Sequence, residues 1–138
     1  MNKVIYATRT GNTKKLALAV AKGADADAQS VDEAGDISGV DTLFVGASVY
    51  AGKIDEKLRR FLGKLTPENV QRVAVFGSAM SGKSALAEIR ALLSANGIAV
   101  SGKEFFCKGR FLLFNRNHPD AGDLANAETF AREMSGGR

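Results

Sequence analysis

Short, almost wholly apolar segments recur along this chain. Val4–Ala7, Thr42–Ala47 and Val73–Gly77 contain hardly any polar side chains. Such strands are typical of a parallel sheet covered on both faces, because neither face has to meet water. The sequence therefore predicts a fold built around a buried parallel sheet.

Weaker strands and amphipathic helices fill the rest of the pattern. Ala28–Val31 and Ile98–Phe106 bring the number of predicted strands to five, and Asp32–Val40 is too short and glycine-broken for more than a helical turn. Asp120, with Asp123 three residues on, is the predicted N-cap of the last helix. The apolar faces of four predicted helices follow helical spacing: Leu16, Ala19 and Val20; Leu58, Phe61, Leu62 and Leu65; Leu86, Ile89 and Leu93; Leu124, Ala127, Ala131 and Met134.

The alternation of strands and helices predicts one doubly wound α/β domain over residues 1–138. Five strands joined by right-handed crossovers admit the order 2-1-3-4-5. In that order, ligands bind beyond the carboxyl ends of the first, third and fourth strands. The loops that begin at Thr8, Ala47 and Ser78 are therefore the candidate site.

The first of these loops has the chemistry of a phosphate site. It consists of Thr8, Arg9, Thr10, Gly11, Asn12 and Thr13, between an apolar strand and a helix. Backbone N–H groups at a helix N-terminus favour an anion, threonine hydroxyls add donors, and a glycine lets the backbone turn closely. The alternative is that Thr10 or Asn12 only caps the helix.

This loop also carries a family resemblance. Tyr6–Thr13 resembles the FMN phosphate loop of flavodoxins, usually written T/S-x-T-G-N-T, and the layout of the whole chain is similar to theirs. The resemblance implies non-covalently bound FMN and a flavodoxin-like five-stranded parallel sheet of order 2-1-3-4-5. Short flavodoxins and flavodoxin-domain proteins such as FMN-dependent protoporphyrinogen oxidases look most similar.

The second loop is predicted to contact the flavin ring through Ser48, Val49, Tyr50, Ala51 and Gly52. An aromatic ring such as that of Tyr50 can stack on a flat tricyclic group. The resemblance implies a peptide flip at the N5 edge of the flavin, which Gly52 would permit. The alternative is that Tyr50 is an ordinary surface aromatic.

The third loop contains a motif with two interpretations. Gly77–Ser84 matches G-x-x-x-x-G-K-S, which alone would indicate a nucleoside triphosphate site. The motif follows the fourth strand, however, and no later strand ends in the aspartate that would hold the metal. The flavodoxin resemblance instead implies a loop along the pyrimidine side of the flavin, formed by Gly77, Ser78, Ala79, Met80, Ser81 and Gly82.

The charge pattern suggests the kind of partner. The net charge is +4, and Arg9, Lys53 and Lys83 lie in the three loops, whereas flavodoxins are usually acidic around the flavin. Redox proteins with acidic surfaces, or an anionic small molecule, are therefore the predicted partners. More basic residues follow the second loop: Lys57, Arg59, Arg60 and Lys64. Nucleic acid is not predicted, because the basic residues are scattered and tryptophan is absent.

Other classes are excluded by what the sequence lacks. No apolar run approaches the roughly 18 residues of a membrane span, and no signal peptide precedes Val4–Ala7. Cys107 is the only cysteine, which rules out an internal disulfide and favours the cytoplasm. One cysteine and one histidine leave no metal cluster.

The sequence thus predicts an FMN-binding redox protein that transfers electrons between protein partners. No catalytic side chain is required, because a flavin itself carries the redox chemistry. The alternative is an FMN-dependent oxidoreductase that acts on a porphyrinogen, bilin or quinone, and a P-loop enzyme is less favoured. Phe111–Phe114 is expected either to close the core or to form an apolar lip near the flavin.

Overall fold

The structure is a computed structural model that describes residues 1–7, 12–49, 54–79, 85–108 and 120–136. Within these ranges, side chains are described at all positions except 12, 48–49, 78–79, 106–108 and 136. Phe111–Phe114 therefore lies outside the described residues.

Five parallel strands form a single sheet. They are β1 (Asn2–Tyr6), β2 (Asp27–Ser30), β3 (Val40–Val49), β4 (Val70–Ala79) and β5 (Ala99–Lys108). Their order is β2-β1-β3-β4-β5, and each neighbouring pair is parallel. The predicted fold class and strand order are confirmed.

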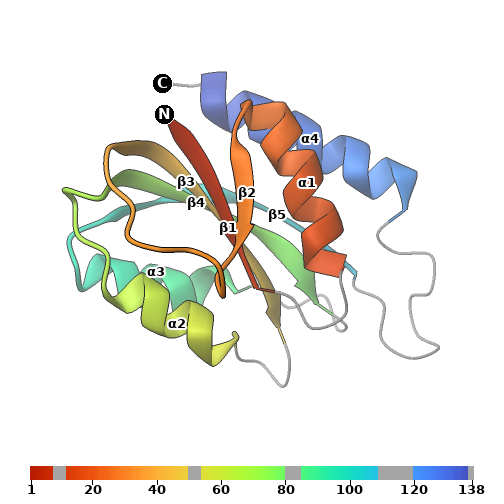
Figure 1. Cartoon of the computed structure of the whole chain (residues 1–138). Coiled ribbons are helices and arrows are strands. Elements are labelled where there is room, and N and C mark those ends of the chain that lie inside the picture. Colours follow the sequence, from red (N-terminus) through yellow and green to blue (C-terminus); the bar gives the residue numbers. More distant parts are fainter. Residues whose placement is uncertain (8–11, 50–53, 80–84, 109–119, 137–138) are drawn as a thin grey trace.

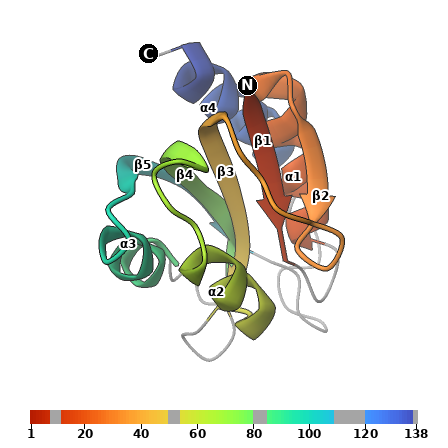
Figure 2. The same cartoon turned by 60° about the vertical axis from the view of Figure 1, so that its left-hand side comes forward.

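Two helices cover each face of this sheet (Figures 1 and 2). Helices α1 (Asn12–Ala24) and α4 (Ala121–Gly136) pack on one face, and α2 (Glu56–Gly63) and α3 (Leu86–Ser94) on the other. Residues of one strand alternate between the two layers: Ile5 belongs to the core under α2 and α3, and Val4 to the core under α1 and α4. All four predicted helices and both apolar layers are present.

The last helix begins as its sequence predicts. The Asp123 backbone N–H donates to Asp120 Oδ1 at 2.8 Å, and the Asp120 N–H donates to Asp123 Oδ2 at 2.9 Å. This reciprocal pair satisfies two donors at the helix start. The prediction that Asp120 caps α4 is confirmed.

The connection between β2 and β3 differs from the other crossovers. Residues 31–39, all of them described, form a turn and an irregular segment but no helix. The turn forms because the Glu33 and Ala34 N–H groups both donate to the Ser30 carbonyl. Val31 and Ile37 pack against the core under α2, so this segment covers the sheet where a helix would otherwise lie.

Candidate functional site

The carboxyl ends of β1, β3 and β4 lie side by side. The Ala7 N–H donates to the Gly46 carbonyl at 3.0 Å, which joins β1 to β3 just before the first loop. β3 and β4 remain in register to their ends, where Val49 pairs with Ala79. The three predicted loops therefore leave the sheet at one edge, the lower one in Figure 1, while the N-terminus and the end of α4 lie at the opposite edge.

The structure describes the flanks of the predicted flavin site. Asn12 and Thr13 begin α1, Ser48 and Val49 end β3, and Gly77 to Ala79 end β4. The other predicted ligands lie outside the described residues: Thr8, Arg9, Thr10, Gly11, Tyr50, Ala51, Gly52, Met80, Ser81 and Gly82. Their contacts with a flavin therefore stay predictions.

The N-terminal end of α1 carries positive charge that no acidic residue in its first turn offsets. Its first turn contains no acidic residue, and Lys14 and Lys15 in that turn are exposed. The other three helices each carry an acid in the first turn: Glu56, Glu88 and Asp123. Because a helix N-terminus carries about half a positive charge, two lysines there are unfavourable unless an anion is bound. The donors and charges at this end of α1 thus fit a terminal phosphate.

Thr13 has a different environment from the one its sequence position suggests. It is completely buried at the start of α1, as is Leu16 one turn later. Replacement of Thr13 would therefore disturb the core under α1 as well as any phosphate site, so this residue is a poor choice for a binding test.

Close packing fixes the sheet just below the loops. Gly46 lies against the buried ring of Phe76 and against Tyr6, and a Cβ atom there would come within 2.6 Å of Phe76 Cζ. Only glycine leaves room for the Phe76 ring at this point of β3, where Gly46 pairs with Tyr6 of β1 on one side and with Phe76 of β4 on the other.

Helix α2 begins immediately after the second loop. Asp55 is its N-cap, and Asp55 Oδ1 accepts from the backbone N–H groups of Lys57 at 2.8 Å and Leu58 at 3.3 Å. The preceding residue, Ile54, is buried, and its N–H donates to Glu88 Oε1 in α3 at 3.2 Å. The end of the second loop is therefore anchored both to α2 and to α3.

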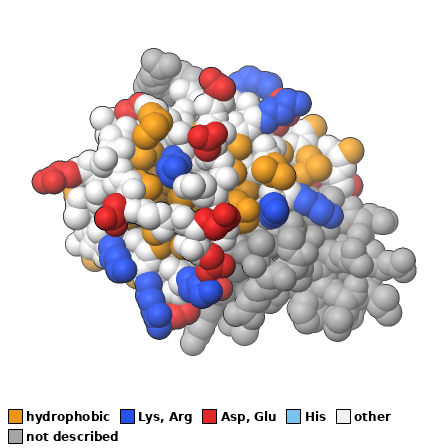
Figure 3. All heavy atoms as spheres, viewed as in Figure 1, with side chains coloured by type: hydrophobic (Ala, Val, Ile, Leu, Met, Phe, Trp, Pro, Cys, Tyr) orange, Lys and Arg blue, Asp and Glu red, His pale blue; other side chains and the backbone are white. Residues whose placement is uncertain are grey.

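Most of the basic residues of α2 face carboxylates. Lys57 Nζ lies 2.8 Å from Asp32, Arg60 Nε lies 3.6 Å from Glu56, and Arg59 pairs with both Glu56 and Glu88. Figure 3 shows acidic and basic side chains interspersed over this part of the surface. The basic residues that follow the second loop in α2 are thus largely neutralised. Lys14 and Lys15 at the start of α1 remain as exposed cations beside the predicted site.

Two of these contacts shift pKa values. The hydrogen bond to Asp32, and then its charge, raise the pKa of Lys57 above its ordinary value of 10.5. The hydrogen bond and charge of Glu88 raise the pKa of the Arg59 guanidinium in the same way. Both cations therefore stay charged at any physiological pH.

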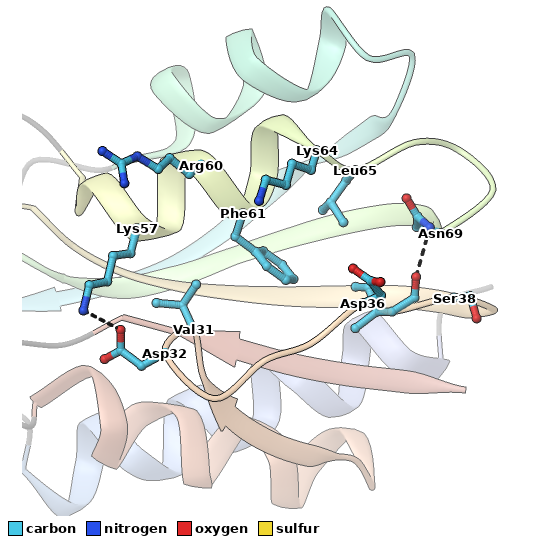
Figure 4. Close-up of a pocket in the computed structure, with 11 residues that line it drawn as sticks. Val31, Asp32, Asp36, Ser38, Lys57, Arg60, Phe61, Lys64, Leu65 and Asn69 are labelled. Atoms are coloured by element: carbon cyan, nitrogen blue, oxygen red, sulfur yellow. Dashed lines mark hydrogen bonds and ion pairs between the residues drawn. The ribbon is translucent and has the colours of Figure 1, made fainter.

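A cavity of about 640 Å³ lies between α2 and the β2–β3 connection (Figure 4). Phe61 points into it from α2, Val31 lies opposite, and the Lys57–Asp32 pair bridges the two sides. At the other side, the Asn69 amide donates to the Ile37 carbonyl at 3.0 Å. The described residues that line the cavity include none of the predicted flavin ligands. It forms because residues 31–39 contribute no helix to pack beside α2.

Sequence reasoning missed Glu88 and the lysine pair of α1. Glu88 lies one turn into a helix whose N-cap, Ala85, makes no side-chain capping bond, so no capping motif marks it. Among the described residues, no group of acids, cysteines or histidines could hold a metal ion. No described helix is both long and apolar enough to cross a membrane.

Comparison with known proteins gives consistent results. Residues 3–104 match the flavodoxin domain family. An uncharacterized protein of Methanocaldococcus jannaschii is 32% identical over 140 aligned positions, which cover 89% of each chain. A flavodoxin of Aquifex aeolicus is 40% identical over 91 positions, which cover 57% of this chain and 49% of that one. A solved flavodoxin from the domain Archaea superposes with a TM-score of 0.78 at 18% identity, covering 99% of this chain and 98% of that one.

Proposed function

The chain belongs to the flavodoxin domain family, whose members bind a flavin and transfer electrons, and from this premise we propose that it binds FMN and passes electrons between protein partners. The observation that carries the choice of FMN is the start of α1. It includes Asn12 and Thr13, the last two residues of the Thr8–Thr13 loop, and its first turn holds two exposed lysines and no acid. A single terminal phosphate suits this one anion site.

Each of the three loops would bind a different part of FMN. Thr8, Thr10 and Asn12 would hold the phosphate, with Arg9 and Gly11 shaping the turn and Thr13 anchoring the helix start. Ser48 to Gly52, above all Tyr50, would cover the ring, and Gly77 to Gly82 would lie along its pyrimidine edge. FMN, once bound, supplies the redox chemistry, so the protein has to bind, orient and shield it.

The partners follow from charge. In the described part of the chain, α2 contributes little net charge, because its cations pair with Asp32, Glu56 and Glu88. An acidic partner surface would therefore have to meet the loop cations Arg9, Lys53 and Lys83. The single cysteine suits a reducing compartment, and we place the protein in the cytoplasm.

Ligand titration tests the cofactor. Apo protein should bind FMN more tightly than riboflavin, which lacks the phosphate, and more tightly than ATP–Mg²⁺. Thr10→Ala should weaken FMN binding by about 1–3 kcal/mol, the scale of hydrogen bonds to a charged group, and Lys83→Ala should have a much smaller effect. Tighter binding of ATP–Mg²⁺, abolished by Lys83→Ala, would support a P-loop protein instead.

Turnover assays separate a carrier from an enzyme. A carrier should accept electrons from a flavodoxin reductase and should show no saturable turnover of porphyrinogens, bilins or quinones. Steady-state turnover of any of these by the isolated protein would instead support the FMN-dependent oxidoreductase.

A further inference from the structure

The Glu88 side chain joins two segments that flank the proposed flavin site. Ile54 directly follows the second loop in the sequence. Glu88 lies in the first turn of α3, shortly after the third loop. Glu88 Oε1 accepts from the Ile54 N–H at 3.2 Å, and Oε2 accepts from Arg59 Nε at 3.1 Å and also from Arg59 Nη2. One carboxylate thus ties the end of one loop to the helix that follows the other.

The position of Glu88 makes this contact unusual. Counted from the N-cap Ala85, Glu88 is the third residue of α3, the position from which the glutamate of a Ser/Thr-x-x-Glu capping box reaches back to the N-cap N–H, but Ala85 has no hydroxyl to complete such a box. Here the carboxylate reaches across to the Ile54 N–H and to Arg59 instead. Glu88 therefore does not cap its own helix. It accepts instead from Ile54 at the end of the second loop and from Arg59 of α2.

The surroundings make the contact strong enough to matter. Glu88 and Arg59 side chains are only 28% and 34% exposed, and Ile54 is buried at 6%. Arg59 Nε and Nη2 both donate to the same carboxylate oxygen, Oε2, which leaves Oε1 to the Ile54 N–H. Hydrogen bonds between two charged groups of this kind are stronger than neutral ones. Arg59 Nη1 also donates to Glu56 Oε2 at 3.1 Å, but Glu56 is 58% exposed and belongs to α2 itself.

We infer that Glu88 is a positioning residue that fixes Ile54, at the end of the second loop, relative to the start of α3, and thereby affects how a flavin is bound. This inference rests on the proposed binding of FMN. Glu88 would act through the Ile54 backbone and Arg59 and would not itself contact the cofactor.

Three variants test the inference. Glu88→Ala removes the whole contact, and Glu88→Gln keeps an oxygen that can accept from Ile54 but loses the charge that binds Arg59. Glu56→Gln is the matched control, because it removes the other carboxylate on Arg59 and leaves Ile54 untouched. Far-UV circular dichroism establishes that each variant is folded.

In the apo proteins, amide hydrogen exchange of Ile54 reports the contact without any cofactor. Loss of a charged hydrogen bond should make this exchange about tenfold faster in Glu88→Ala, with a smaller change in Glu88→Gln and none in Glu56→Gln. Exchange of Ile54 that is equal in all four proteins would overturn the inference.

With FMN, the visible circular dichroism at saturation reports the surroundings of the ring. Glu88→Ala should change this spectrum and raise the FMN dissociation constant about five- to tenfold, while Glu56→Gln should match the wild type. A Glu88→Ala protein with wild-type spectrum and affinity would overturn the positioning role. If the wild type takes up no FMN, the proposed function fails, and the Ile54 exchange still decides whether the contact exists.

Discussion

Lys57 forms an ion pair between α2 and the irregular β2–β3 connection. Its ammonium group lies 2.8 Å from Asp32, so α2 and residues 31–39 are bridged across the cavity (Figure 4). Both side chains are well exposed, and exposed pairs are screened by salt and contribute little to stability. The pair is better regarded as a marker of local geometry than as a source of stability.

The titration of Lys57 should reveal this pair. Because Asp32 raises the pKa of Lys57 above 10.5, the stabilisation by the pair is complete below pH 10.5 and is lost as the pH rises through the raised pKa. An NMR titration of the lysine side-chain signals should show Lys57 deprotonating later than in Asp32→Asn. Identical titration curves in the two proteins would contradict the contact.

Gly46→Ala should be destabilising because the added methyl group has no space. Its Cβ would lie 2.6 Å from Phe76 Cζ and 3.0 Å from Tyr6 Cβ, inside a closely packed core. Overpacking of this kind costs about 1–3 kcal/mol, measured as the free energy of unfolding in urea. Gly102→Ala is the matched strand control, since no atom lies within 4 Å of its added Cβ. Equal effects at the two positions would refute this account.

At the scale of whole elements, short apolar runs and helical spacing predicted the five strands and four helices of the described residues, but not their ends. β3 and β4 each extend to ten residues, because backbone pairing continues past the apolar residues, from Val40↔Val70 to Val49↔Ala79. α2 ends at Gly63, yet Leu65 just beyond it is also buried. The helical spacing therefore wrongly placed Leu65 inside the helix. A pattern of side chains identifies buried faces and cannot show where backbone hydrogen bonds stop.

The register of β5 against β4 could not be predicted from the sequence either. Val73 pairs with Val100, whereas Val75 pairs with Glu104, so β5 contains two more residues than β4 over this interval. This β-bulge includes Ser101, whose hydroxyl accepts from the Lys103 N–H at 3.2 Å. Such a bulge depends on contacts with the neighbouring strand, which no local pattern records.

The contact between α1 and α4 offers a test at this scale. A Cβ atom on Gly23 would lie 2.1 Å from the Glu128 backbone oxygen and 3.0 Å from Ala131 Cβ. Gly23→Ala should therefore force the helices apart and cost about 1–3 kcal/mol or more, with faster amide exchange throughout α4. Gly63→Ala, a helical glycine with no atom within 4 Å, should be neutral or slightly stabilising. Unchanged exchange in α4 would show that the helices do not meet at this glycine.

For the molecule as a whole, the strand order placed the site but could not supply its details. The order 2-1-3-4-5 brings the ends of β1, β3 and β4 to one edge, and this follows from connectivity alone. The pairing of Arg59 with Glu88 and of Lys57 with Asp32 joins residues from different elements. Sequence spacing carries no information about such pairs, so the neutralisation of Lys57 and Arg59 could not be predicted.

Binding of the cofactor should stabilise the entire domain. A ligand that binds only the folded state at 100 times its dissociation constant adds about 2.7 kcal/mol to the free energy of unfolding. FMN should therefore raise the thermal unfolding midpoint, and it should do so less at the same concentration in Thr10→Ala. No shift with FMN, together with a shift produced by ATP–Mg²⁺, would contradict the proposed cofactor.

The layering of the helices also has a consequence during synthesis. Phe130 of α4 packs edge-on against Phe44 of β3, with ring centroids 6.3 Å apart, although more than eighty residues separate them in the chain. At a translation rate of roughly 5–20 residues per second, the ribosome needs on the order of ten seconds to make the intervening chain. Until α4 has emerged, the β3 face around Phe44 is covered by α1 but lacks the part of its cover that α4 provides. A nascent chain stalled at that stage would expose apolar surface that chaperones bind.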